Sequence, residues 1–110
     1  MATTDPTPCP ADRYVHAHRQ AEQVALKVIS ASPRRFRGRH DVWELLGLVA
    51  PELGEWASFF GYLSMRVEVA AAGEHAIISA READDLTRDL ERFCADAARR
   101  VRRVGARGAS

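Results

Sequence analysis

One arginine and one histidine near the start of the chain have the residue types and the spacing that metal-independent RNA cleavage requires. His18 follows Arg13 by five positions, so the histidine could act as a general acid or base while the arginine stabilises charge on the phosphate. Arg34 and Arg35 precede His40 at similar spacings. With 15 arginines and four histidines in the chain, such pairs also arise by chance. The candidates for catalysis are Arg13 and His18.

A basic segment over residues 33–40 offers a second kind of chemistry, which is nucleic-acid binding. Guanidinium groups bind phosphates, and an exposed aromatic ring stacks on an unpaired base. The alternative is a solvated loop whose arginines pair with acidic helix ends, and the net charge of +1 does not decide between the two. The predicted nucleic-acid-binding residues are Arg34, Arg35, Phe36, Arg37, Arg39 and His40.

The sequence predicts no metal site and no cofactor. His16 and His18 are two positions apart, and on a helix they point about 200° from one another, so one metal cannot take both. Cys9 and Cys94 form no CxxC pair, and no glycine-rich phosphate loop is present. The two scattered cysteines favour a reducing compartment, and no stretch has the length and apolarity of a signal peptide or a membrane span. We therefore expect a cytoplasmic protein with no membrane association.

The elements that position these residues are helices. Apolar residues recur at steps of three and four over residues 11–30, 42–50, 51–72 and 80–104, which indicates amphipathic helices. Asp41 with Glu44, and Ser79 with Glu82, are capping boxes at two helix starts. The predicted fold is all-α, an antiparallel up-and-down bundle of four to five helices. We expect a disordered leader at residues 1–10, one domain at 11–104 and a flexible tail at 105–110.

The third predicted helix carries a second stripe of small or unbranched side chains roughly opposite its aromatic stripe. Small side chains let another helix approach closely, so this face needs a neighbour, either another helix of this chain or a second copy. We assign the stripe to a dimer interface made by Gly54, Ala57, Gly61 and Met65.

Two segments resemble the signatures of HEPN domains. Residues 17–28, AHRQAEQVALKV, are similar to the family's first-helix run, and residues 40–46, HDVWELL, are similar to its second signature. With the later helices, the resemblance covers residues 11–104 and points to a small stand-alone HEPN branch of GC-rich bacteria. It implies a bundle of four or five helices, usually dimeric, in a superfamily linked to RNA cleavage, nucleotide binding and toxin–antitoxin systems.

The chain departs from nuclease-type HEPN proteins at the catalytic motif. Those proteins carry an arginine followed four to six residues later by a histidine near the start of a late helix, whereas Arg66, Arg81 and Arg88 have no histidine at that spacing. The resemblance therefore favours a non-catalytic module that binds a partner protein or RNA or a nucleotide, as a homodimer. The alternatives are a toxin-like metal-independent RNase using Arg13 and His18, and an interaction protein with no nucleic-acid role.

Overall fold

The computed structural model describes residues 9–109 of the chain, with side chains for residues 9–105. All regular structure in this range is helical. The elements are α1 (Pro10–Ala31), α2 (Val42–Val49), the 3-10 turn η1 (Pro51–Leu53), α3 (Gly54–Ala71), the 3-10 turn η2 (His75–Ile77) and α4 (Ala80–Ala109). The prediction of an all-α helical bundle is confirmed.

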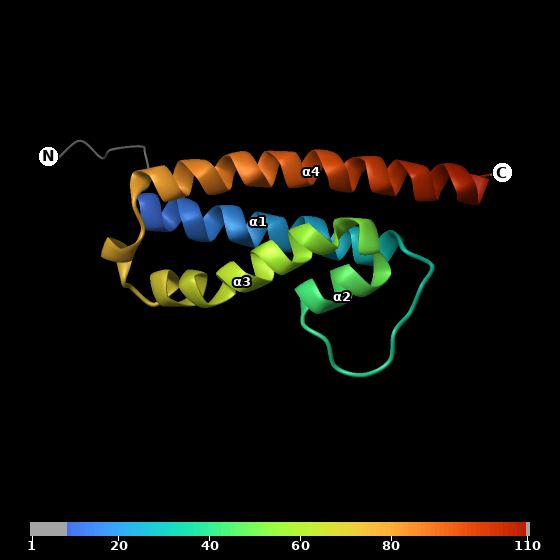
Figure 1. Cartoon of the computed structure of the whole chain (residues 1–110), viewed down its shortest axis with the longest axis horizontal. Coiled ribbons are helices and arrows are strands. Elements are labelled where there is room, and N and C mark those ends of the chain that lie inside the picture. The colour runs from blue at the N-terminus through green and yellow to red at the C-terminus, as the bar shows by residue number, and fades with distance from the viewer. Residues whose placement is uncertain (1–8, 110) are drawn as a thin grey trace, which may run out of the picture.

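The two longest helices, α1 and α4, lie side by side and run in the same direction, while α3 runs against both (Figure 1). Arg13 near the start of α1 pairs with Asp84 near the start of α4, and Arg19 of α1 pairs with Glu68 late in α3. Residues 32–41 carry the chain back along the bundle before α2 begins. For this reason the helices do not alternate strictly in direction, as a simple up-and-down order would require.

Alanines line the contact between α1 and α4. The buried face of α1 carries small side chains at helical spacing, namely Ala11, Ala17, Ala21 and Ala25. Ala83 and Ala97 are buried on α4. Small side chains let the two helix backbones approach closely over a long distance, and this explains why these two helices pair so extensively.

The core is aromatic where α2, α3 and α4 meet. The Trp43 ring stacks on Phe60 at a centroid distance of 5.0 Å, and Phe60 lies 5.1 Å from Phe93. Trp56 also packs beside Phe60, and its indole N–H donates to Asp96 Oδ2 at 2.8 Å. This cluster anchors the short α2 to the two longer helices.

Both predicted capping boxes are present. The Glu44 amide donates to Asp41 Oδ1 at 2.8 Å, and the Glu82 amide donates to Ser79 Oγ at 3.0 Å. Gly73 ends the connection after α3 with φ of 112°, a left-handed conformation that favours glycine. The local sequence thus determines where α2 and α4 start and where α3 stops.

The helix ends differ from the expected boundaries. The predicted leader lies outside the described residues except for Cys9 and Pro10, which begin α1. A 3-10 turn occupies Pro51–Leu53 before α3 starts, and α4 continues to Ala109, past the expected end at residue 104. In the described part of the chain, none of the helices is both long enough and apolar enough to cross a bilayer.

Candidate nucleic-acid interface

The basic segment forms an ordered loop between α1 and α2, which we call the arginine loop (residues 32–41). The buried Ser32 follows the end of α1, and its hydroxyl accepts from the Arg34 amide at 3.2 Å. Gly38 has φ of 93°, and His40 Nε2 donates to the Arg37 carbonyl at 2.9 Å. These local hydrogen bonds give the loop a defined shape without a helix or a strand.

The loop arginines have no acidic partner within the described part of the chain. All four side chains are exposed, and within residues 9–105 no carboxylate lies within 4.0 Å of Arg34, Arg35, Arg37 or Arg39. Arg35 Nη1 instead donates to the Ser32 carbonyl at 2.6 Å, and the Arg34 guanidinium lies 5.1 Å from the centre of the Phe36 ring. Carbonyl and cation–π contacts leave the positive charge uncompensated, so the alternative that these arginines serve acidic helix ends is not what the structure shows.

A groove of about 810 Å³ runs between the arginine loop and the last turns of α4. Arg34 of the loop and Arg100 of α4 both line it, together with the apolar side chains of Val49, Val101 and Val104. A smaller hollow of about 300 Å³ lies next to it, bounded by Phe36, Leu45 and the end of α1 among others. Apolar walls flanked by guanidinium groups suit a planar, negatively charged ligand.

The α4 side of this groove is the part that sequence reasoning missed. Val101 and Val104 belong to the apolar spacing of residues 80–104, but Val101 is 37% exposed, and both line the groove. Both valines lie on the apolar face of α4. Because α4 extends beyond the end of α1 (Figure 1), α1 does not cover them. An apolar stripe longer than the partner helix is the signal that could have revealed this surface.

Three arginines at the end of α4 are paired with carboxylates, whereas Arg102 has no carboxylate within 4.0 Å among residues 9–105. Arg100, whose side chain is only 14% exposed, pairs with Glu52 and donates to the Val49 carbonyl at 2.9 Å. Arg103 lies 3.5 Å from the same Glu52 carboxylate, and Arg99 pairs with Asp96. Burial raises the pKa of Glu52, but its own backbone amide and Arg100 outweigh this effect and hold the pKa below its usual value.

The structure does not bring Arg13 and His18 together. His18 is 1% exposed, its Nε2 donates to the Phe60 carbonyl at 2.9 Å, and its ring packs edge-on against Trp43. Arg13 points instead toward α4, where its Nη1 donates to Asp84 at 2.7 Å. Among the residues that the structure describes, His18 Nδ1 and Trp43 Nε1 are both buried without a hydrogen-bond partner. In this conformation the imidazole is part of the core and is not accessible to a substrate.

Arg66, one of the late-helix arginines with no histidine at the catalytic spacing, is engaged in an ion pair that links α3 to α4. Arg66 donates to both Glu82 carboxylate oxygens at 3.0 Å and also to the Ile77 carbonyl. This contact lowers the pKa of Glu82. Two parallel N–H donors on one carboxylate form a bidentate ion pair, which is stronger than a pair with a single hydrogen bond. Arg66 therefore links α3 to the start of α4.

The predicted dimer stripe is divided between two environments. Gly54, Ala57 and Gly61 line a groove of about 480 Å³ that α3 shares with α2 of the same chain. Ala57 is only 5% exposed, and a side chain at Gly61 would meet Trp43 Cβ at 3.4 Å. The close neighbour of this stripe is therefore α2. Met65, by contrast, is 82% exposed.

An apolar strip on α3 remains uncovered around Met65. Tyr62 is 86% exposed and Val69 is 44% exposed, and both lie within one helical turn of Met65. A contiguous exposed apolar strip is characteristic of an interaction surface. None of the three residues of this strip, Tyr62, Met65 and Val69, lines the groove beside the arginine loop.

Comparisons with known proteins identify the family of the chain. A family model described as SAV_6107-like HEPN matches residues 4–98. No match is found among curated proteins or among solved structures. The matched range contains α1, α2, α3 and most of α4, together with the arginine loop. The chain therefore belongs to the SAV_6107-like HEPN family.

Proposed function

We propose that this chain is a non-catalytic HEPN module that binds single-stranded RNA through the arginine loop. The observation that carries the proposal is the set of four exposed loop arginines without a carboxylate partner in the described residues. Unpaired guanidinium groups on a defined loop bind phosphates without first breaking an internal ion pair. A cytoplasmic location is part of the proposal.

The groove beside the loop supports a single strand as the ligand. An unpaired base stacks on the Phe36 ring or on the Arg34 guanidinium plane, whereas Arg37 and Arg39 contact the flanking phosphates. Bases inside a duplex have no free face for such stacking. The ligand is accordingly a loop or an end of an RNA with unstacked bases.

Binding without cleavage is favoured over the nuclease alternative by the state of the catalytic candidates. A general acid or base must lie within hydrogen-bond reach of the reacting group. His18 is buried and uses Nε2 on a backbone carbonyl, and Arg13 is engaged with Asp84. Cleavage through this pair requires the core around Trp43 to open.

We further propose that the module is a homodimer that buries the α3 strip of Tyr62, Met65 and Val69. Three large apolar side chains exposed on one helix face are costly to leave in water. A two-fold axis across α3 would cover the strip on both copies with the same residues. The arginine loops remain free in this arrangement because they are not part of the strip.

The RNA proposal is tested by replacing the four loop arginines, Arg34, Arg35, Arg37 and Arg39, with alanine. Binding of a fluorescein-labelled single-stranded RNA is measured by anisotropy at several salt concentrations. We expect affinity to fall about 100-fold, and the dependence of log K on log salt to become shallower by about 3, because each lost phosphate contact contributes about 0.7.

The matched control replaces Arg99 and Arg103, which are also exposed but are paired with carboxylates. This variant is expected to keep the slope and most of the affinity. Equal losses in the two variants, or no binding by the unmodified protein, contradict the proposal. The same RNA incubated with protein in EDTA should remain intact, and degradation that His18→Ala abolishes would establish the nuclease alternative instead.

The dimer is tested with the double substitution Tyr62→Glu and Met65→Glu, with mass measured by light scattering after gel filtration. We expect a dimer for the unmodified chain and a monomer for the variant, because four buried like charges at the interface oppose association. Leu26→Glu, at a residue of α1 that is 45% exposed, should leave the dimer intact. An unmodified chain that is monomeric excludes this part of the proposal.

A further inference from the structure

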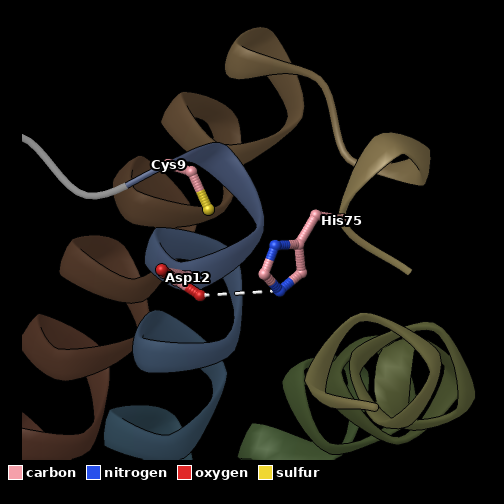
Figure 2. A group of neighbouring side chains, drawn as sticks. All are labelled: Cys9, Asp12 and His75. Atoms are coloured by element: carbon pink, nitrogen blue, oxygen red, sulfur yellow. Dashed lines mark ion pairs between the residues drawn. The ribbon is translucent and has the colours of Figure 1, made fainter. Parts of the chain in front are cut away.

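Three side chains of metal-ligand type meet at the end of the bundle where α1 begins. Cys9 precedes the first residue of α1, Asp12 lies in its first turn, and His75 reaches across from η2 (Figure 2). One ligand atom from each residue lies within 4.8 Å of the other two, and Asp12 Oδ1 is 3.9 Å from His75 Nε2. The arginine loop lies at the other end of α1 (Figure 1), so this cluster is separate from the proposed RNA interface.

We propose that Cys9, Asp12 and His75 form a Zn²⁺ site. Thiolate, carboxylate and imidazole are the three ligand types that zinc takes from proteins, whereas Mg²⁺ and Ca²⁺ prefer oxygen ligands alone. Zinc bond lengths place tetrahedral ligand atoms roughly 3.5 Å apart. The distances between ligand atoms therefore need to shorten by about 1.3 Å at most, which rotation about the side-chain bonds of these exposed residues supplies.

The backbones that carry the ligands are already held in place. The Cys9 carbonyl accepts from the Arg13 amide at 3.0 Å, which fixes the start of α1. The His75 amide donates to the Gly73 carbonyl at 2.8 Å, and the His75 carbonyl accepts from the Ile78 amide at 3.3 Å. Only side chains have to move when the ion binds, so little backbone entropy is lost.

A bound ion fastens the start of α1 to the connection between α3 and α4. Three protein ligands leave the fourth tetrahedral position for water or another small donor. Because Cys9 and Asp12 are three positions apart on a helix start, they face the same side, and His75 completes the set from a distant part of the sequence. The earlier expectation of no metal site considered only residues that are close in sequence.

The site is tested with Co²⁺ as a spectroscopic substitute for Zn²⁺ in a phosphine-reduced sample of the whole chain. Thiolate ligation gives a near-ultraviolet charge-transfer band, and stoichiometric Zn²⁺ should remove it. We expect one ion per chain, loss of the band in Cys9→Ser, and affinity at least about tenfold lower in His75→Ala and in Asp12→Asn.

Matched controls use the other residues of the same types. Cys94→Ser and His40→Ala should bind Co²⁺ as the unmodified chain does, because neither residue belongs to the cluster. Circular dichroism verifies that each variant is folded. Absence of the band, a band lost with Cys94 instead of Cys9, or unchanged affinity in His75→Ala overturns the proposal, since the last result means that a cysteine alone holds the ion.

Thiol alkylation gives a second readout within one sample. Zn²⁺ should slow alkylation of Cys9 about tenfold or more, because a bound thiolate is not free to react. Cys94 is the internal reference, and its alkylation should not change with Zn²⁺. Zn²⁺ at a hundredfold excess over its Kd should also raise the Tm by about 10 to 15 °C, and Zn²⁺-independent alkylation with an unchanged Tm contradicts the site.

Discussion

The two arginine-rich regions of this protein have similar composition and opposite surroundings. In the arginine loop Arg35 contacts backbone carbonyls and Arg34 contacts an aromatic ring. At the end of α4, Arg99, Arg100 and Arg103 contact carboxylates. Counting charges along the sequence does not distinguish these regions. Whether an arginine is available to a ligand depends on which groups the fold places next to it.

The difference has a structural cause. At the end of α4, Asp96 lies one helical turn before Arg99, and the turn η1 brings Glu52 against Arg100 and Arg103. The arginine loop extends away from the helices (Figure 1). The acid nearest in sequence to the loop arginines, Asp41, uses its carboxylate to cap α2. The α4 arginines therefore stabilise the fold, while the loop arginines keep their charge for a partner.

The largest expected difference between the arginine loop and the end of α4 is in the free energy of unfolding after single arginine substitutions. Arg100→Ala removes an ion pair and leaves the Val49 carbonyl without its charged donor, so we expect the free energy of unfolding to fall by about 1.5 to 3 kcal/mol. Arg37→Ala should change it by less than about 0.5 kcal/mol. Urea unfolding followed by circular dichroism measures both, and equal values would show that the two regions do not differ in this way.

A second experiment tests whether the aromatic ring in the arginine loop stacks on a base of the bound RNA. Phe36→Ala should weaken binding of single-stranded RNA about 10-fold, because stacking contributes about 1 to 3 kcal/mol per base. Phe36→Tyr keeps the ring and should retain the affinity. Phe36 is half-buried against the core, so anisotropy titrations are run well below the Tm of each variant. Similar losses for alanine and tyrosine would argue against stacking.

The smallest expected effect is a pH dependence confined to the α4 region. Because the pKa of Glu52 is lower in the folded chain, its ion pairs stabilise the protein at neutral pH and this contribution is lost as the pH falls through the lowered value. In Glu52→Gln the free energy of unfolding should fall less steeply as the pH is lowered than it does in the unmodified chain. The change should be small, because these side chains are partly exposed.

The same titration provides a control on the arginine loop. Glu52 contacts arginines of α4 and none of the loop arginines, so RNA affinity should not follow the Glu52 transition as long as the protein remains folded. A parallel loss of RNA affinity and of the Glu52 contribution would indicate that the two regions act as one site. Anisotropy measured in the unmodified chain and in Glu52→Gln separates these outcomes.

Much of the fold could be predicted from local pattern. Apolar spacing located all four α-helices, and the capping residues at Asp41 and Ser79 located two of their starts. Such signals act over one or two turns, so neighbouring residues carry all the information. The relative direction of α1 and α4 could not be predicted in this way, because it depends on the path of residues 32–41.

The candidate site was predictable only in part. The arginine loop is continuous in sequence and was identified as a basic segment, but the other wall of the groove comes from Val101 and Val104 of α4. His18 looked suitable for catalysis because residue type and spacing say nothing about burial. The long-range packing of α1 against Trp43 and Phe60 places this histidine in the core.

The sequence by itself determined that the chain is helical, where α2 and α4 begin, and that residues 33–40 form a basic segment. The tertiary structure alone decided which charges are compensated, which histidine is buried and which distant side chains, such as Cys9 and His75, become neighbours. The physical reason is that helix formation follows from interactions a few residues apart, whereas ion pairs, burial and ligand geometry depend on how the helices pack.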